Sequence, residues 1–559
     1  MHSHVPLTPV TLLERSARSY PKSCALVHSG GEVSFSELLH RSRCLAQVLL
    51  RLKVEHGDRV AVLSENNIQT VEAHFAVPGA GAVLVMLNPW LSESDVLNLL
   101  YFSEAKVLIV EAALYQKLTE VNRRRLEQVL RVLVINLPGA PSESGVLDYA
   151  AYIAAADGSL LLDRQVVSEV DAIAINFTSG TTGHPKGVIY SHRAGYLHTL
   201  GQVLMLDLNR HSKYLWTLPM FHVNGWGHMW ACIATGCTQV IPKIELTQHP
   251  ADGFMALVRE QGITHLAGAP RLVKLLTDIP DAQDTLRGIT IMTGGSAPSP
   301  TLIQQLENRG VNLIHQYGLN ETCGPFVVCE KQEEWRAHTP ETQAKLHARQ
   351  GTAAIHAGTG LQVLDTNGQA VPHDGCTLGE VVMAGNTLAL GYYKNPEATQ
   401  QAFRGGWFYS GDMAVVHPDG YLEIRDRIKD LIYVETEYGW ENISSIEIEN
   451  VLCRHSAIQD AAVLGVVHSI GESNSLQLIA VIEIQPGARL NEAEFHAYCS
   501  ATLNIYQRPQ AVLFATLPKT NTGKVRKELL HRMVQQQSVD EINLPSHGAQ
   551  PAKEFVDSR

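Results

Sequence analysis

The stretch Asn176-Phe-Thr-Ser-Gly-Thr-Thr-Gly-His-Pro-Lys-Gly187 combines glycines, hydroxyl side chains and a lysine. An apolar run at residues 172–177 leads into it and predicts a buried strand. Glycines let backbone N–H groups approach an anion, hydroxyls add neutral donors, and the lysine adds a positive charge. Because a glycine follows the lysine, the stretch lacks the Gly-Lys-[Ser/Thr] of a Walker A loop. We therefore predict a different phosphate-binding loop, with the candidate ligands Thr178, Ser179, Gly180, Thr181, Thr182, Gly183 and Lys186.

On both sides of this loop, short apolar runs alternate with helical patterns. Runs without polar interruption that alternate with helices are typical of parallel strands covered on both faces. The sequence therefore predicts an α/β fold with mostly parallel sheets. The predicted strands lie at 59–63, 105–110, 132–135, 172–177 and 239–241, and the predicted helices include 36–52 and 115–128.

A polar, turn-rich stretch at residues 412–430 predicts a domain boundary. We expect a large N-terminal domain over 1–428, a small α+β domain over 429–540 and a frayed polar tail over 541–559. In the small domain we predict helices at 446–454 and 493–503 and strands at 458–467, 476–483 and 511–514.

The composition excludes several classes of protein. The 559 residues are 45% hydrophobic and 18% charged, which is typical of a globular chain with large cores. The net charge of −12, without a basic cluster, argues against a nucleic-acid binder. The longest apolar run, at 75–87, is too short for membrane insertion. No secretory signal is visible, and the nine scattered cysteines lack a CxxC pair, so we expect reduced thiols in a cytoplasmic protein.

Six further motifs follow the phosphate loop in a fixed order. Together they resemble the adenylate-forming superfamily of acyl- and aryl-CoA synthetases, firefly luciferase and peptide-synthetase adenylation domains. The resemblance covers almost the whole chain and is strongest to medium-chain acyl-CoA and aromatic acid ligases. The motifs are Leu218-Pro-Met-Phe-His-Val223, Thr293-Gly-Gly-Ser-Ala-Pro298, Tyr317-Gly-Leu-Asn-Glu-Thr322, Tyr409-Ser-Gly-Asp412, Asp426-Arg-Ile-Lys-Asp430 and Pro518-Lys-Thr-Asn-Thr-Gly-Lys524.

This resemblance implies that ATP and Mg²⁺ activate a carboxylic acid to acyl-AMP and pyrophosphate. Both reactants are anions, so positioning and charge neutralisation dominate such catalysis. By resemblance, Lys524 in a mobile lid bridges the carboxylate and the α-phosphate, and Glu321 binds Mg²⁺. The other implied roles are adenine binding by Tyr317, Ser296, Ala297 and Pro298, ribose binding by Asp412 and Arg427, pocket gating by His222 and hinge motion at Lys429.

The chain departs from the family pattern at Asn320, which replaces a threonine but still offers an amide donor to the α-phosphate. A second departure is the longer segment 433–442, which the family builds as a short glycine-rich loop. Its bulky and acidic residues disfavour CoA, whereas the family's majority favours it. The predicted acyl and acceptor pocket comprises Trp226, Gly294, Gly295, Gly318, Phe326, Gly439 and Trp440.

Two acceptors stay open on these grounds. The acyl group passes either to CoA, giving a thioester, or to an amino acid amine, giving an amide as in coronafacate ligase. A module that binds nucleotide without turnover is disfavoured, since Lys524, Glu321 and Asp412 are all present. The resemblance implies a monomer or a homodimer whose partners are a small carboxylic acid and the acceptor.

Overall fold

The computed structural model describes residues 5–137, 146–162, 165–178, 186–242, 252–277, 279, 283–436, 439–470, 473–519 and 525–536. The chain divides into two compact units, which we call unit 1 (Met1–Leu361 and Met383–Phe408) and unit 2 (Gln362–Val382 and Tyr409–Arg559). These units differ from the predicted boundary at 428–429, because residues 409–427 pack with 362–382. The prediction that 429–540 moves as a lid stays a prediction, and the predicted tail at 541–559 lies outside the described residues.

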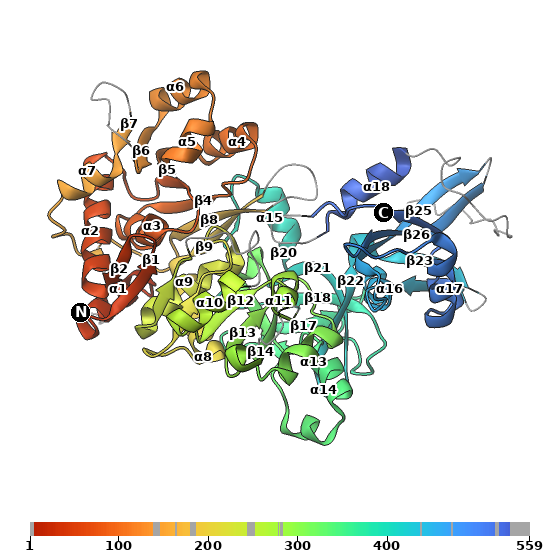
Figure 1. The fold of residues 1–559 in the computed structure, drawn as a ribbon. Coiled ribbons are helices and arrows are strands. Elements are labelled where there is room, and N and C mark those ends of the chain that lie inside the picture. The colour runs from red at the N-terminus through yellow and green to blue at the C-terminus, as the bar shows by residue number, and fades with distance from the viewer. Residues whose placement is uncertain are drawn as a thin grey trace. The chain divides into compact units, whose positions relative to one another are not determined.

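Unit 1 contains two large sheets built mostly from parallel strands (Figure 1). In the eight-stranded sheet of the described residues, neighbouring strands from β4 to β7 run parallel, and so does β8 beside β4. In order across that sheet the strands are β19 (Gly391–Tyr392), β9 (Lys186–Ser191), β8 (Ala172–Thr178), β4 (Val83–Leu87), β3 (Arg59–Leu63), β5 (Ala105–Glu111), β6 (Arg131–Ile135) and β7 (Val146–Asp148).

The second sheet of unit 1 carries parallel strands in its centre and antiparallel strands at both edges. Both faces of its central strands β12 and β13 are buried, as expected for a sheet covered on both sides. In order, the strands found in the described residues are β16 (Thr352–Ala353), β15 (Gly324–Val328), β14 (Asn312–Leu319), β13 (Thr290–Thr293), β12 (His265–Gly268), β10 (Lys213–Leu215), β11 (Thr238–Val240), β1 (Cys24–His28) and β2 (Gly31–Ser34).

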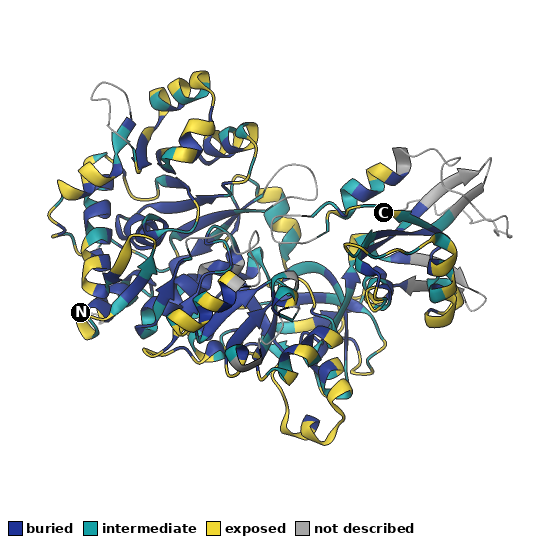
Figure 2. Ribbon diagram, viewed as in Figure 1, coloured by how far each residue is buried: buried dark blue, intermediate teal, exposed yellow. Residues whose placement is uncertain are grey.

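Helices cover these sheets and leave the strands buried (Figure 2). Their starts follow local capping chemistry: the Asn67 side chain accepts from Thr70 N before α3, and Ser191 accepts from Ala194 N before α8. The helices are α1 (Val10–Ser19), α2 (Phe35–Arg51), α3 (Ile68–Gly79), α4 (Glu93–Ser103), α5 (Ala112–Lys117), α6 (Glu120–Val129), α7 (Tyr149–Ala154), α8 (His192–Leu206), α9 (Val223–Thr235), α10 (Asp252–Gln261), α11 (Pro270–Thr277), α12 (Gln283–Leu286), α13 (Pro300–Asn308), α14 (Pro340–His347) and α15 (Pro396–Ala402).

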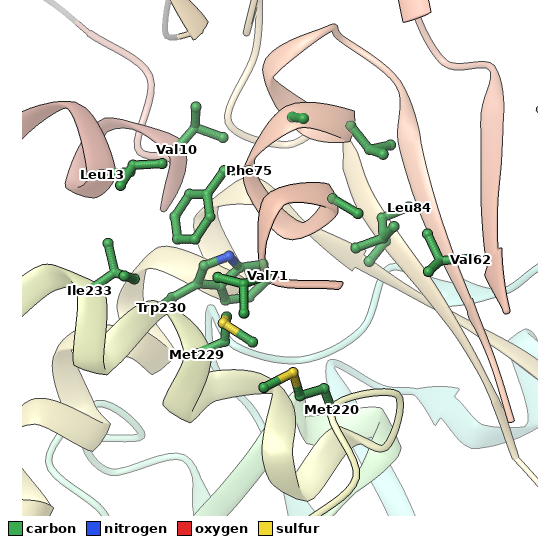
Figure 3. Close-up of a cluster of buried hydrophobic side chains, with 14 of the residues drawn as sticks. Val10, Leu13, Val62, Val71, Phe75, Leu84, Met220, Met229, Trp230 and Ile233 are labelled. Carbon is green, nitrogen blue, oxygen red and sulfur yellow. The ribbon is translucent and has the colours of Figure 1, made fainter. Parts of the chain in front are cut away.

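The largest apolar cluster of unit 1 lies where α9 meets α1 and α3 (Figure 3). Trp230 of α9 is fully buried there, and the cluster also contains Phe75 and Val71 of α3. Burial of a large side chain contributes about 1.5–3 kcal/mol, so this cluster fixes α9 firmly against its neighbours. Helix α9 thereby becomes a rigid support for the residues at its start.

Unit 2 contains small sheets and three helices along its described chain. Strands β25 and β26 pair antiparallel, whereas β26 and β27 pair parallel. A five-stranded sheet has the order β17-β18-β21-β20, with β22 beside β21, and two further sheets pair β23 with β24 and β25 with β26 and β27. Strand β20 (Phe403–Arg404) falls in unit 1 by the division given above. The other elements are β17 (Leu361–Leu364), β18 (Gly379–Met383), β21 (Trp407–Val416), β22 (Leu422–Arg427), β23 (Ile432–Thr436), β24 (Gly439–Ile443), α16 (Ser445–Leu452), β25 (Ile458–Ile470), β26 (Ser473–Ile484), α17 (Glu492–Thr502), β27 (Ala511–Phe514) and α18 (Lys527–Gln536).

The fold confirms the predicted α/β class, and two local predictions are wrong. The helix predicted at 115–128 is broken into α5 and α6, because the Glu93 carboxylate accepts a hydrogen bond from Thr119 N at 2.7 Å between them. In the segment predicted as a loop at 433–442, the described residues form two antiparallel strands, 432–436 and 439–443, with Ile432 paired to Ile443. In the part of the chain that the structure describes, no helix is long and apolar enough to cross a membrane.

Candidate active site

The predicted phosphate loop joins two antiparallel strands, and its described ends lie opposite each other. Thr178 ends β8, Lys186 begins β9, and the two residues are partners in the strand register. Directly opposed residues of an antiparallel pair project to the same face, so the hydroxyl and the ammonium group share one side of the sheet. The remaining predicted ligands, Ser179, Gly180, Thr181, Thr182 and Gly183, lie outside the described residues.

Lys186 lies over an aromatic ring that the sequence analysis did not select. Its Nζ atom is 4.9 Å from the centre of the Tyr392 ring, within cation–π range. The Tyr392 hydroxyl donates a hydrogen bond to Glu321 Oε1 at 2.7 Å. Strand β19 places Tyr392 opposite Val188 of β9, and Ala389 N donates to Glu321 O at 2.8 Å. One tyrosine thus connects the predicted phosphate-binding lysine to the predicted metal-binding glutamate.

The state of the Tyr392 hydroxyl follows from its surroundings. Burial and the neighbouring Glu321 carboxylate raise the pKa of Tyr392 far above its usual range. The hydroxyl therefore keeps its proton at physiological pH and orients the carboxylate as a donor. No local pattern marks this tyrosine, because its partner is 71 residues away in the chain.

Tyr317, Gly318, Asn320 and Glu321 lie at a tight turn between the antiparallel strands β14 and β15, through the short helix η2 (Asn320–Thr322). The Thr322 hydroxyl accepts from Leu319 N at 2.9 Å and donates to Gly324 O at 2.5 Å, which closes the turn. A Cβ atom on Gly318 would lie 2.1 Å from Gly324 O, so the hairpin itself requires glycine there. This packing holds the amide of residue 320 and the carboxylate of residue 321 at the tip.

The predicted adenine-side turn follows β13. A Cβ on Gly294 would lie 3.0 Å from the Gln316 backbone oxygen, so a glycine lets this turn pack closely on β14. Gly295 has a φ of 84°, a conformation that favours glycine. Ser296 and Ala297 are exposed, and Pro298 is buried.

His222 lies immediately before α9, on a segment that is tied to the other sheet of unit 1. Asn66, which follows β3, donates from Nδ2 to Leu218 O at 2.8 Å and accepts from Met220 N at 2.7 Å. His222 is half-buried at the end of this tied segment. The two hydrogen bonds of Asn66 hold the backbone just before His222 in a defined position, and the gating role of His222 stays a prediction.

The other predicted pocket residues of unit 1 differ in how the structure describes them. The Phe326 ring on β15 is fully buried, so it forms part of the interior beneath the turn. The backbone of Trp226 lies in α9, and its side chain is not among the described ones.

In unit 2 the two predicted ribose ligands form an ion pair with each other. Arg427 Nε lies 2.9 Å from Asp412 Oδ1, and the residues are partners across β21 and β22. The Asp412 side chain is buried and the arginine is half-buried, at 5% and 30% exposure. The pair fixes the position of both side chains.

The remaining predicted residues also belong to unit 2. Lys429 lies in a short helix, η4 (Ile428–Asp430), directly after β22. Gly439 and Trp440 lie on β24, paired with Thr436 and Glu435 of β23. Lys524 lies outside the described residues.

The donor set can be compared with the implied Mg²⁺ ion. Among the residues that the structure describes, no group of three or more His, Cys, Asp or Glu side chains could hold a metal. Mg²⁺ uses one or two carboxylates together with substrate phosphates and water, rather than an all-protein cage. The single oriented carboxylate of Glu321 fits that mode of binding.

Comparison with known proteins identifies the family. A family model described as AMP-binding enzyme matches residues 13–393, and the model of the C-terminal domain of AMP-binding enzymes matches 447–524. The chain belongs to the family of AMP-binding enzymes. The first of these matches covers both sheets of unit 1 and all the predicted site motifs of that unit, and the second covers the predicted motif at 518–524.

Several named relatives of this AMP-binding enzyme are similar over nearly their whole length. It is 35% identical over 554 residues to the peroxisomal trans-cinnamate:CoA ligase of Petunia hybrida, covering 95% of this chain and 94% of the relative. It is 36% identical to 4-hydroxybutyrate–CoA ligase 2 of Metallosphaera sedula, with 94% of each chain covered. It is 37% identical to 2-methylpropanoate–CoA ligase CCL4 of Humulus lupulus, covering 95% and 96%.

Solved structures of the same fold agree with the arrangement of this AMP-binding enzyme. The anthranilate CoA ligase AuaEII in complex with anthranoyl-AMP gives a TM-score of 0.81 at 24% identity, covering 95% of this chain and 98% of that one. A benzoate CoA ligase from Burkholderia xenovorans LB400 gives 0.78 at 22% identity, covering 94% and 99%. At these identities the likeness shows the fold.

Proposed function

We propose that this protein is an ATP-dependent acid–CoA ligase. In the first step a carboxylate oxygen attacks the α-phosphorus of ATP, which gives acyl-AMP and releases pyrophosphate. In the second step the thiol of CoA attacks the acyl carbonyl, which gives acyl-CoA and releases AMP. Family membership and full-length similarity to named CoA ligases support this proposal.

The observation that carries the proposal is the line of contacts from Lys186 through Tyr392 to Glu321. It brings a phosphate-directed cation and a phosphate-directed carboxylate together from three distant segments. In our proposal the lysine and the Thr178 hydroxyl hold the triphosphate, while Glu321 holds Mg²⁺. When bound, that ion neutralises phosphate charge and orients the departing pyrophosphate.

The other side chains take roles that suit their chemistry. We assign hydrogen bonding at the α-phosphate to Asn320 and stacking on adenine to Tyr317, beside the turn at 296–298. The Asp412 and Arg427 pair would bind the ribose hydroxyls, because its carboxylate accepts and its guanidinium donates. Lys429 serves as the hinge in this proposal.

We assign the acyl group to the space bounded by His222, Trp226, the Gly294–Gly295 backbone and the start of β15 near Phe326. The relatives named above act on acids that range from 2-methylpropanoate to cinnamate by name. A compact apolar or cyclic acid fits this choice of walls.

CoA is the favoured acceptor over an amine. Each relative named above is a CoA ligase by name. In the segment 433–442 that argued for an amine, the described residues 433–436 and 439–442 are paired strands. Pyrophosphate exchange into ATP with a panel of acids tests the first step. Thioester formation from CoA, measured beside amide formation from amino acids, tests the second. Amide product without thioester would overturn the choice of acceptor.

We assign to the Lys524 ammonium group the role of neutralising negative charge between the substrate carboxylate and the α-phosphate. Loss of one such electrostatic donor costs about 10²–10³ in rate. We expect Lys524→Ala to lose that factor in acid-dependent pyrophosphate exchange. Lys345→Ala is the matched control, because that exposed lysine pairs with Glu341 one turn away in α14. Equal exchange rates for Lys524→Ala and its parent would refute the assignment.

We also propose a cytoplasmic location and a monomeric or dimeric state. All nine cysteines lie in described residues and none forms a disulfide, which suits a reducing compartment. Imaging of the tagged protein in cells and light scattering of the purified protein test these two points.

A further inference from the structure

A chain of polar side chains crosses the interior of unit 1. The Tyr214 hydroxyl lies 2.7 Å from His228 Nδ1, and His228 Nε2 lies 3.0 Å from Gln202 Oε1. Gln202 Nε2 lies 3.1 Å from His198 Nε2. The chain connects β10 through α9 to α8, and all four side chains are fully or almost fully buried.

A third imidazole, that of His356, continues this chain toward β15. The rings of His198 and His356 meet edge to face with centroids 5.3 Å apart. His356 Nε2 lies 2.9 Å from Pro325 O, the backbone next to Phe326. The polar chain therefore ends behind the strand that carries the catalytic turn.

Glycines make the room for both rings. A Cβ atom on Gly227 of α9 would lie 2.4 Å from the His198 ring, and one on Gly324 of β15 would lie 2.6 Å from it. A Cβ on Gly201 of α8 would lie 2.0 Å from His356 Nδ1. The His198 ring is thus wedged between α9 and β15 and fills the space that two missing side chains leave.

The hydrogen-bond pattern leaves the buried His198 ring with a donor that no described residue satisfies, which is unusual for a side chain packed in the interior. Burial lowers the pKa of His198 well below its usual range, so the ring is neutral. Because Nε2 accepts from Gln202, the ring proton lies on Nδ1, and within the described part of the chain that atom has no hydrogen-bond partner. A buried donor without an acceptor is costly, and an apolar side chain of this size would avoid the cost.

The two elements that hold the ring are also the proposed walls of the acyl pocket. Gly227 follows Trp226 on the helix that begins after His222, and Gly324 closes the turn that carries Glu321. We propose that His198 is a specificity-determining residue, whose ring forms the floor of the acyl pocket and restricts the enzyme to short acids. This inference rests on the proposed ligase function.

The test compares acid selectivity among variants of the full chain. The kcat/KM for acid-dependent pyrophosphate exchange is measured for straight-chain acids from acetate to octanoate. We expect His198→Ala to move the preferred acid to a longer chain. One methylene in an apolar pocket is worth about 10–200-fold, so the ratio of longer to shorter acid should rise about 10-fold or more.

Three variants separate pocket depth from other effects. His198→Leu keeps a side chain of similar size without the ring proton, so it should keep the parental preference for short acids. His74→Ala removes another fully buried imidazole, which packs on Trp230 instead, and should lower stability without a shift in selectivity. His198→Asn removes less volume, should shift selectivity in the same direction, and decides the question if the alanine variant does not fold.

The failures are distinguishable. If the parent exchanges pyrophosphate and the His198→Ala and His198→Asn variants keep its acid preference, the ring is core packing and the inference falls while the proposed function stands. A shift in His198→Leu as large as in His198→Ala would also overturn it, since size would not be the cause. If the parent exchanges pyrophosphate with no acid, the proposed function fails and takes the inference with it.

Discussion

Replacement of Lys527 by methionine should destabilise unit 2 strongly, because it removes the charge at the centre of a buried network. Lys527 Nζ lies 2.8 Å from Glu449 Oε1, with side-chain exposures of 14% and 18%. It also bonds to Ser445, whose hydroxyl donates to Asp426 Oδ2 at 2.6 Å. Methionine keeps the length of the stem, so the change isolates the loss of charge.

The expected magnitude follows from the burial of the two carboxylates that remain. Removal of one partner from a buried ion pair costs about 3–5 kcal/mol. Because the Lys527 side chain is partly exposed to solvent, we expect the free energy of unfolding to fall by the lower end of this range, about 3 kcal/mol. For a unit of this size that corresponds to a decrease in melting temperature of about 6–12 °C.

The pH dependence provides a second, independent signature. Burial raises the pKa of both Asp426 and Glu449 in the folded protein, and loss of the lysine raises each pKa further. A carboxyl whose folded pKa is raised stabilises the fold below its unfolded pKa of about 4, and that stability is lost as pH rises through the folded pKa. The deficit of Lys527→Met should therefore widen from pH 5 to pH 8.

Calorimetry of the full-length variant measures the deficit, and hydrogen exchange by mass spectrometry localises it to α16 and α18. Lys345→Met is the control, since an exposed pair one helical turn apart contributes about 0.3–0.5 kcal/mol. The reasoning would be refuted if Lys527→Met melted within 2 °C of the parent at pH 8, a difference equal to about 1 kcal/mol at most. It would also be refuted if the difference in stability between variant and parent became smaller as pH rises.

Three further predictions concern the site itself. Tyr392→Phe removes the hydrogen bond to the Glu321 carboxylate, worth about 1.5–3 kcal/mol, so kcat/KM for ATP in the exchange assay should fall about 10–100-fold. Gly318→Ala places a Cβ against the Gly324 carbonyl, so thermal unfolding should show a loss of about 1–3 kcal/mol together with weak exchange. Asp412→Asn removes the charge that we propose to bind the ribose, and titration calorimetry should show AMP affinity lowered about 10-fold; unchanged affinity would contradict ribose binding there.

The sequence predicted the strands well and the tertiary contacts of the site poorly. The strands at 59–63 and 511–514 have the predicted bounds, because unbroken apolar runs between polar turns leave little choice. The prediction of one helix at 115–128 was wrong, since the hydrogen bond that interrupts it is accepted by Glu93 of α4, 26 residues away in the chain. The pairing of 432–436 with 439–443 was missed because a family comparison of loop length carries no information on strand pairing.

The predicted site residues all come from motifs and their roles stay predictions, whereas residues that are marked only by their contacts were not selected. Tyr392 has no motif of its own, and only the pairing of β19 with β9 places it over Lys186. His198 was missed for the same reason, since its meaning depends on two glycines in other elements. A single sequence records which groups are present, whereas their partners are set by folding.

The wedged ring of His198 also constrains how this protein can evolve. Positions 198, 227 and 324 share one volume, so a larger residue at either glycine position is tolerated only after the histidine has been replaced by something smaller. Substitutions there must occur in a set order, and their effects will not add. A library randomised at these three positions together should yield folded sequences that three separate single-site libraries never contain.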